Sequence, residues 1–182
     1  MSQDFVIEAY MKTDQSAETE LAIALGSNLG DRIAHLRAAL TQLEHAVGKV
    51  LGKSKLYYSH PVGNVEGEFL NAVVLLKTRT PMDSWMPTLL AVESAMGRVR
   101  GGQSGNRTID LDLILGRRDG SCLVLTQQNL LVPHPRAHER EFVMRPLSDV
   151  VPEWEWPTFN KTVKQLAAQC RQDQVIRVVD HW

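Results

Sequence analysis

The amino-acid sequence predicts a single α+β domain, and three observations carry that prediction. The chain has 182 residues, a length that suits one domain with a substantial core. Polar and apolar residues alternate over residues 108–113, the period-two pattern of a β-strand with one buried face. Apolar residues recur at steps of four and three from Leu29 to Val47, the pattern of a one-sided α-helix. We place the domain at residues 21–182.

Composition and charge exclude several classes of protein. A hydrophobic content of 43% and a charged content of 23% are typical of a globular protein. The net charge of -1 gives no electrostatic basis for broad binding to nucleic acid or to an anionic membrane. No apolar run of about 18 residues and no signal-type N-terminus is present. Cys122 and Cys170 lack metal-ligand spacing, so we expect two reduced thiols in a cytoplasmic protein, with one disulfide as the alternative.

The first elements lie between residues 1 and 48. Residues 1–20 are acidic, and we expect a mobile extension rather than an added edge strand. Residues 21–25 form an apolar run that predicts a buried strand, and residues 29–47 are the predicted helix. Ser27 or Asn28 is the expected helix cap, and Gly48 the expected end. The glycine turn between strand and helix could bind phosphate, but it matches no phosphate-binding fingerprint, so we favour a structural role.

The middle of the chain predicts two strands, a helix and two long loops. Residues 55–59 and 69–78 are the predicted strands, joined by an irregular loop whose length suggests function. Asn71 interrupts the second strand, and a buried amide requires hydrogen-bond partners from the backbone or from a ligand. Residues 80–97 predict a helix that Pro87 should kink or restart. Nine arginines and no lysine lie between Thr78 and Asn160, a bias that suits phosphate binding, with solvated arginines as the alternative.

Asp110 and Asp112 are the candidate metal ligands. On the predicted strand they point to the same face, opposite Ile109, Leu111 and Leu113, with Cα atoms roughly 6–7 Å apart. Mg²⁺ prefers one or two carboxylates together with water and substrate phosphates. The pair therefore suits a metal–nucleotide complex, and the alternative is a solvated face that only keeps the strand soluble.

The last third of the chain holds a dense polar segment at residues 131–142. Two histidines and two arginines lie there beside an aromatic residue, but Pro135 separates the histidines and no third ligand has zinc spacing. We further predict a short strand at residues 123–125, an amphipathic helix at residues 163–170 and a closing strand at residues 175–179.

Several motifs, taken in order, resemble those of one known enzyme family. They are residues 24–30 (ALGSNLG), 69–72 (FLNA), 97–100 (GRVR), 107–112 (RTIDLD) and 132–134 (VPH). The set is similar to the 6-hydroxymethyl-7,8-dihydropterin pyrophosphokinases of folate biosynthesis, from about residue 21 to residue 151. That resemblance implies a ferredoxin-like α/β sandwich, in which a mainly antiparallel sheet is backed by helices and mobile loops cover the site. It also implies diphosphate transfer from ATP to the pterin hydroxymethyl group, with release of AMP and two Mg²⁺ ions.

The resemblance also assigns roles to individual residues. It implies that Asp110 and Asp112 bind the metal ions. Charge stabilisation during transfer falls to Arg98, Arg100 and Arg107. The ATP site comprises Glu93, Arg100, Arg107, His134 and Arg140. The pterin site comprises Ser59, Val62, Phe69, Asn71 and Phe142. The expected partners are therefore small molecules, acting on a monomer without nucleic acid or membrane.

The loop before Arg107 departs from the family pattern. The family usually has Arg-Trp-Gly-Pro-Arg where this chain has Gln103, Ser104, Gly105, Asn106 and Arg107, so a tryptophan and a proline are missing. Because that loop closes over both substrates in the family, two alternatives stay open. One is a paralogue that binds or acts on a different pterin, and the other is a pterin- or nucleotide-binding module without catalysis.

Overall fold

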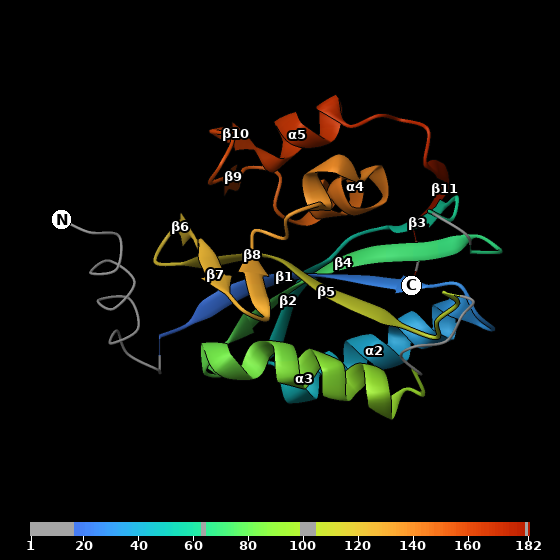
Figure 1. Ribbon diagram of the computed structural model, residues 1–182, viewed down its shortest axis with the longest axis horizontal. Coiled ribbons are helices and arrows are strands. Elements are labelled where there is room, and N and C mark those ends of the chain that lie inside the picture. The colour runs from blue at the N-terminus through green and yellow to red at the C-terminus, as the bar shows by residue number, and fades with distance from the viewer. Residues whose placement is uncertain (1–16, 63–64, 99–104, 181) are drawn as a thin grey trace.

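The computed structural model describes residues 17–62, 65–98, 105–180 and 182. Within these residues an antiparallel sheet lies between two pairs of helices (Figure 1). Helices α2 and α3 cover one face, and α4 and α5 cover the other. The predicted α+β sandwich is confirmed, with helices on both faces of its sheet. None of the described helices has the length and apolar character needed to span a bilayer.

The main sheet has the strand order β11-β3-β4-β1-β5-β6, and β2 pairs with part of β4. Its strands are β1 (Thr19–Ser27), β2 (Lys49–Lys53), β3 (Leu56–Ser59), β4 (Phe69–Thr78), β5 (Asp110–Arg118), β6 (Ser121–Cys122) and β11 (Val175–Val179). Two small hairpins lie beside it: β7 (Leu125–Gln127) with β8 (Leu130–Val132), and β9 (Glu155–Trp156) with β10 (Lys161–Thr162).

Strand β1 is the centre of the sheet, because it pairs antiparallel with β4 on one side and β5 on the other. The predicted strand at residues 21–25 is confirmed, and β1 extends two residues beyond it at each end. Thr19 and Glu20 therefore belong to the sheet rather than to the predicted extension. Glu18, just before the strand, forms ion pairs with Lys77 and Arg79. Residues 1–16 lie outside the described residues.

The four α-helices are α2 (Arg32–Ala46), α3 (Met82–Ala95), α4 (Glu141–Val150) and α5 (Val163–Gln169). The prediction of Ser27 or Asn28 as the cap of α2 is wrong, because Asp31 accepts a hydrogen bond from the Ala34 N–H at 3.0 Å. Gly30, at φ +54°, first turns the chain away from β1. Helix α3 runs on through Pro87 without restarting.

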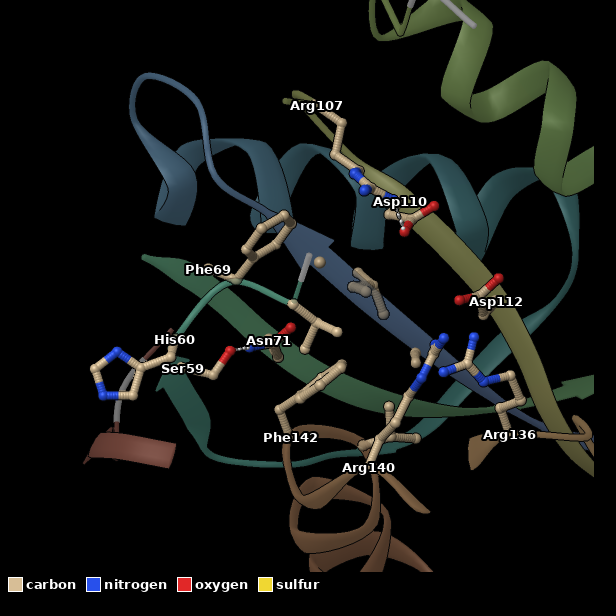
Figure 2. Close-up of a pocket in the computed structure, with 15 residues that line it drawn as sticks. Ser59, His60, Phe69, Asn71, Arg107, Asp110, Asp112, Arg136, Arg140 and Phe142 are labelled. Carbon is tan, nitrogen blue, oxygen red and sulfur yellow. Dashed lines mark hydrogen bonds and ion pairs between the residues drawn. The ribbon is translucent and has the colours of Figure 1, made fainter. Parts of the chain in front are cut away.

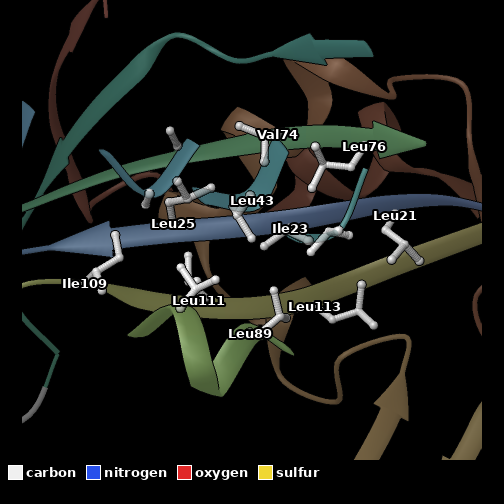
Figure 3. Packing of buried hydrophobic residues seen from close by; sticks show 14 of the residues in the cluster. Leu21, Ile23, Leu25, Leu43, Val74, Leu76, Leu89, Ile109, Leu111 and Leu113 are labelled. Atoms are coloured by element: carbon white, nitrogen blue, oxygen red, sulfur yellow. The ribbon is translucent and has the colours of Figure 1, made fainter. Parts of the chain in front are cut away.

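The sheet divides the core into two clusters, and Figure 3 shows the one on the side of α2 and α3. Leu21, Ile23 and Leu25 of β1 point toward α2 and α3, where they meet Leu43 and Leu89. Ala22 points to the other face, where β1 meets α4 and α5. Alternate residues of a strand point to opposite sides of the sheet. Since Leu21, Ile23 and Leu25 occupy alternate positions, all three large side chains lie on the first face. Beyond Glu20, the opposite face of β1 carries only Ala22, Ala24 and Gly26, and the two residues nearest the end of the strand leave space above them.

Several parts of the fold differ from the prediction, including the short strands β6 to β10. Strand β2 and helix α4 were not predicted, and a 3₁₀ helix at Ala137–Glu139 precedes α4. The strand predicted at residues 123–125 is wrong, because those residues mostly connect β6 to β7. The predicted helix at residues 163–170 and strand at residues 175–179 are confirmed as α5 and β11.

Candidate active site

The candidate site is a cavity of about 270 Å³ on the face of the sheet that carries the small residues of β1 (Figure 2). Its floor follows the strand register: Asn71 of β4 lies opposite Gly26 of β1, and Gly26 lies opposite Asp110 of β5. Two residue pairs further along, on the same face, Ala24 lies opposite Asp112. The complete lining is Ala24, Leu25, Gly26, Ser59, His60, Val62, Phe69, Asn71, Arg107, Asp110, Asp112, Arg136, Arg140, Phe142 and Val143.

Asn71 lies at one end of this cavity and is held in one orientation. Its Nδ2 donates hydrogen bonds to the Tyr57 carbonyl at 3.1 Å and to Ser59 Oγ at 2.9 Å. With both amide hydrogens used, Oδ1 points toward the space above Gly26, where an added Cβ would lie 3.5 Å away. Asn71 is 6% exposed, and the acceptor that it aims into the cavity can take a hydrogen bond from a donor on a bound ligand.

Two aromatic rings flank Asn71. Phe69 comes from the start of β4 and Phe142 from the first turn of α4, and Figure 2 shows them on opposite sides of the Asn71 amide. An apolar space between two rings suits a flat heterocycle, and the amide between them can read its hydrogen-bonding edge. Val62 lies at the rim with 54% of its surface exposed. All five predicted pterin residues therefore line one cavity.

Asp110 lies at the opposite end of the cavity within a cluster of charges. The Arg107 Nη1 lies 2.6 Å from Asp110 Oδ2, and the Arg98 guanidinium contacts Asp110 Oδ1. Arg98 also contacts Glu93, which is 1% exposed and accepts a hydrogen bond from the Leu111 N–H at 2.8 Å. Glu93 thus lies behind β5, where it holds the strand and Arg98. Arg100, the remaining predicted arginine, lies outside the described residues.

Asp112 is the second carboxylate of the pair. Burial, followed by the negative charge of Asp110, raises the pKa of Asp112 above its ordinary value. Figure 2 shows the Arg136 and Arg140 guanidinium groups directed toward it. His134 lies nearby, outside the cavity lining, and its Nδ1 accepts a hydrogen bond from the Arg136 N–H at 3.2 Å. Burial lowers the pKa of His134, so the neutral ring is favoured.

The donor set suits a hard divalent cation bound together with a substrate. Among the described residues, no group of three or more His, Cys, Asp or Glu side chains could hold a metal alone. Asp110 and Asp112 supply two carboxylates on one strand face, which is the number that Mg²⁺ uses when phosphates complete its shell. A cation would also offset the unfavourable burial of charge on Asp112. The residues therefore fit the metal that the sequence predicts.

Six residues of the cavity lining are not among the predicted site residues: Ala24, Leu25, Gly26, His60, Arg136 and Val143. Gly26 was assigned a structural turn, yet it forms the floor between Asn71 and Asp110. Arg136 belongs to the polar segment at residues 131–142, but the sequence pattern does not indicate which side of the segment faces the site. His60 and Val143 gave no signal, because an exposed loop residue and a helical valine have no pattern specific to a site.

Comparisons with known proteins give a consistent result. A model of the family 7,8-dihydro-6-hydroxymethylpterin-pyrophosphokinase (HPPK) matches residues 22–152. A 2-amino-4-hydroxy-6-hydroxymethyldihydropteridine pyrophosphokinase of Synechocystis sp. is 36% identical over 149 residues, which cover 81% of this chain and 74% of that protein. The protein of the same name from Bacillus subtilis is 38% identical over 135 residues, covering 73% of this chain and 78% of that protein.

Solved structures agree at the level of fold. The chain resembles Plasmodium falciparum HPPK-DHPS wild type with SDX-DHP, with a TM-score of 0.66 and 16% identity over 84% of this chain. An HPPK-DHPS in complex with substrates gives a TM-score of 0.66 at 14% identity. The chain spans 44% and 43% of those two solved chains, less than half of their length.

Proposed function

Because the chain belongs to the 7,8-dihydro-6-hydroxymethylpterin-pyrophosphokinase family, we propose that it transfers diphosphate from ATP to 6-hydroxymethyl-7,8-dihydropterin. The hydroxymethyl oxygen bonds to the β-phosphorus of ATP, and the bond from that phosphorus to the α-phosphate breaks. AMP leaves, the hydroxyl proton passes to solvent, and the product is the pterin diphosphate of folate biosynthesis.

One relationship carries this proposal: the pterin-type site and the carboxylate pair share the same floor. Asn71 and Asp110 lie on opposite sides of Gly26, on strands two apart, so their backbones are roughly 10 Å apart. A bicyclic ring bound between Phe69 and Phe142 therefore directs a substituent toward the carboxylates. Holding both reactants in this way supplies much of the catalysis, since phosphoryl-type transfer needs no protein nucleophile.

The arginines supply positive charge around the reacting phosphates. Arg107 and Arg98 approach from the side of β5, and Arg136 and Arg140 approach from the segment before α4. Guanidinium groups match pairs of phosphate oxygens, and charge held in place stabilises the charge that develops during transfer. Arg98 and Arg107 are both paired with Asp110. Transfer of those guanidinium groups from Asp110 to phosphate would free the carboxylate for a cation.

We assign two Mg²⁺ ions to Asp110 and Asp112, together with the phosphates of ATP. When bound, the ions draw electron density from the phosphate oxygens and bring the polyphosphate into line. His134, with its neutral ring favoured, remains a proposed nucleotide contact, as does Arg100. We also propose that the protein acts as a monomer in the cytoplasm, a reducing compartment that suits the free thiols of Cys122 and Cys170.

AMP formation from ATP and 6-hydroxymethyl-7,8-dihydropterin in Mg²⁺ tests the proposal, with Asp112→Ala as the blank. We expect AMP and the pterin diphosphate in equal amounts, and neither in the blank. Absence of AMP despite binding of this pterin would favour a non-catalytic module, and absence of binding would favour a paralogue for another pterin. If Asp110→Asn leaves the binding of pterin and nucleotide unchanged, that result would also indicate a module without catalysis.

A further inference from the structure

Gln174 connects two walls of the cavity from outside it. It immediately precedes β11, the edge strand that pairs with β3, and lies beyond the residues matched by the family model (Figure 1). Its carbonyl accepts a hydrogen bond from the His60 N–H at 2.9 Å. Its side-chain Oε1 accepts a hydrogen bond from the Glu141 N–H at 2.9 Å. One residue therefore contacts the loop wall, through His60, and the helical wall, through α4.

Glu141 in turn binds the backbone of Gln174 through its buried carboxylate. It is 1% exposed, and its Oε2 accepts hydrogen bonds from the Gln174 N–H at 2.8 Å and the Val175 N–H at 2.9 Å. Its Oε1 accepts one from Arg145 Nη1 at 3.2 Å. A carboxylate buried in this way is stable only while its donors stay in place, so it specifies one position of β11 against α4.

The start of α4 depends on this pairing. Its N-cap residue, Arg140, provides no side-chain hydrogen bond, so Gln174 supplies an acceptor that the helix itself lacks. The residue after Glu141 is Phe142, one of the two rings flanking Asn71. On the other side, Gln174 holds His60, which lies beside Ser59 at the same end of the cavity (Figure 2).

We infer that Glu141 and Gln174 form a clasp that positions Phe142 and His60 for the pterin. The inference rests on the proposed function, which makes that end of the cavity the pterin site. Both residues act through others, so they are positioning residues. A loosened wall must be ordered again on binding, so breaking the clasp weakens pterin affinity more than nucleotide affinity.

The test uses Gln174→Met, which keeps the side-chain length but removes Oε1, and Glu141→Gln, which removes the buried charge. Gln172→Met is the matched control, because Gln172 is exposed two residues earlier on the same segment. Calorimetry measures the Kd of the pterin alone and of an MgATP analogue alone, and initial rates give KM and kcat. Thermal unfolding confirms that each variant is folded.

We expect Gln174→Met to raise the pterin Kd and KM about tenfold, with nucleotide Kd and kcat changed by less than about threefold. The Gln172→Met control should match the wild type. The clasp would be overturned if folded Gln174→Met binds pterin as tightly as the wild type does. It would also be overturned if the variant loses affinity for pterin and for the MgATP analogue by the same factor. If Glu141→Gln does not fold, the pterin affinity of Gln174→Met still tests the clasp. Failure of the wild type to bind pterin would instead overturn the proposed function, and the role of the clasp with it.

Discussion

The side chain of Asn28 holds the backbone of Arg107. Asn28 Oδ1 accepts a hydrogen bond from the Arg107 N–H at 2.7 Å, and the Asn28 N–H donates to the Arg107 carbonyl at 3.2 Å. Asn28 Nδ2 donates to Asn106 Oδ1 at 2.7 Å and to the Glu66 carbonyl at 3.2 Å. The turn after β1 thus fixes the arginine beside Asp110 and joins it to the loop that precedes β4.

Asn28→Ala should lower kcat/KM by about 10-fold to 100-fold while the protein stays folded. The change removes three side-chain hydrogen bonds, and a displacement of Arg107 by about 1 Å is enough for a loss of this size. Initial rates with both substrates measure it. Asn129→Ala, at the exposed turn between β7 and β8, is the control and should keep the wild-type rate. Equal rates in all three proteins would mean that Arg107 needs no support from Asn28.

Arg107→Ala should lower kcat about 10²-fold, because it removes a guanidinium held in advance beside the reacting phosphates. Arg37→Ala, on the exposed side of α2, removes an arginine without touching the cavity and should retain activity. Single-turnover AMP formation separates the chemical step from binding. A near-normal rate in Arg107→Ala would mean that Arg107 does not stabilise the reacting phosphates and serves only to offset the charge of Asp110.

Local patterns in the sequence predicted the strands that form the floor. Strand β4 has its predicted bounds, and Ile109, Leu111 and Leu113 are at most 3% exposed, opposite the two aspartates. Period two determines which face each residue occupies, so that much follows from sequence alone. The register between paired strands does not follow from the sequence pattern of either strand. The placement of Gly26 between Asn71 and Asp110 depends on pairing between segments far apart in the chain.

Long-range contacts explain most of what sequence reasoning missed. Helix α4 takes an acceptor from Gln174, more than thirty residues along the chain, so its start carries no local capping signal. Glu93 was expected near the nucleotide on resemblance, while its burial behind Leu111 depends on how α3 packs on β5. Such contacts become visible only when the tertiary structure is known.

Asp112→Asn should stabilise the metal-free protein while abolishing transfer. Because the pKa of Asp112 is raised on folding, the folded protein binds the proton more tightly than the unfolded chain does. The wild type therefore loses stability as pH rises from about 4, the ordinary aspartate value, through the raised pKa. The uncharged amide avoids this loss. Urea unfolding in EDTA should show an advantage for the variant at pH 7 that disappears at pH 3.

Asp110→Asn is the matched comparison, and it should not stabilise the metal-free protein. Asp110 is paired with Arg98 and Arg107, so neutralising it leaves two guanidinium groups without that partner. A gain in stability for Asp110→Asn equal to that for Asp112→Asn would show that the two carboxylates have the same environment.

Tyr57→Phe should cost about 1–2 kcal/mol of unfolding free energy with little change in kcat. The Tyr57 hydroxyl donates to Asp149 Oδ2 at 2.7 Å, which joins β3 to α4. Burial and the Asp149 carboxylate raise the pKa of Tyr57, so the phenol keeps its proton at working pH. Among the described residues, no hydrogen bond reaches the Tyr58 hydroxyl, so Tyr58→Phe is the control. Equal urea midpoints for both variants would contradict the prediction.

Gly26→Ala tests the floor itself, and it should weaken the pterin rather than the fold. An added Cβ would lie 3.5 Å from Asn71 Oδ1 and 3.8 Å from the Asp110 Cβ, ordinary contact distances that need no movement of the chain. The methyl group would nevertheless occupy the space through which a ligand reaches Oδ1. We expect the pterin KM to rise about tenfold or more, since a buried acceptor would lose its partner, with the ATP KM little changed. Gly52→Ala on β2 is the matched strand-glycine control, because its added Cβ would lie 3.6 Å from Val150 Cγ1, and it should bind pterin normally. If Gly26→Ala leaves the pterin KM unchanged, the ligand does not lie on this floor, and the position of the ring between Phe69 and Phe142 must be reassigned.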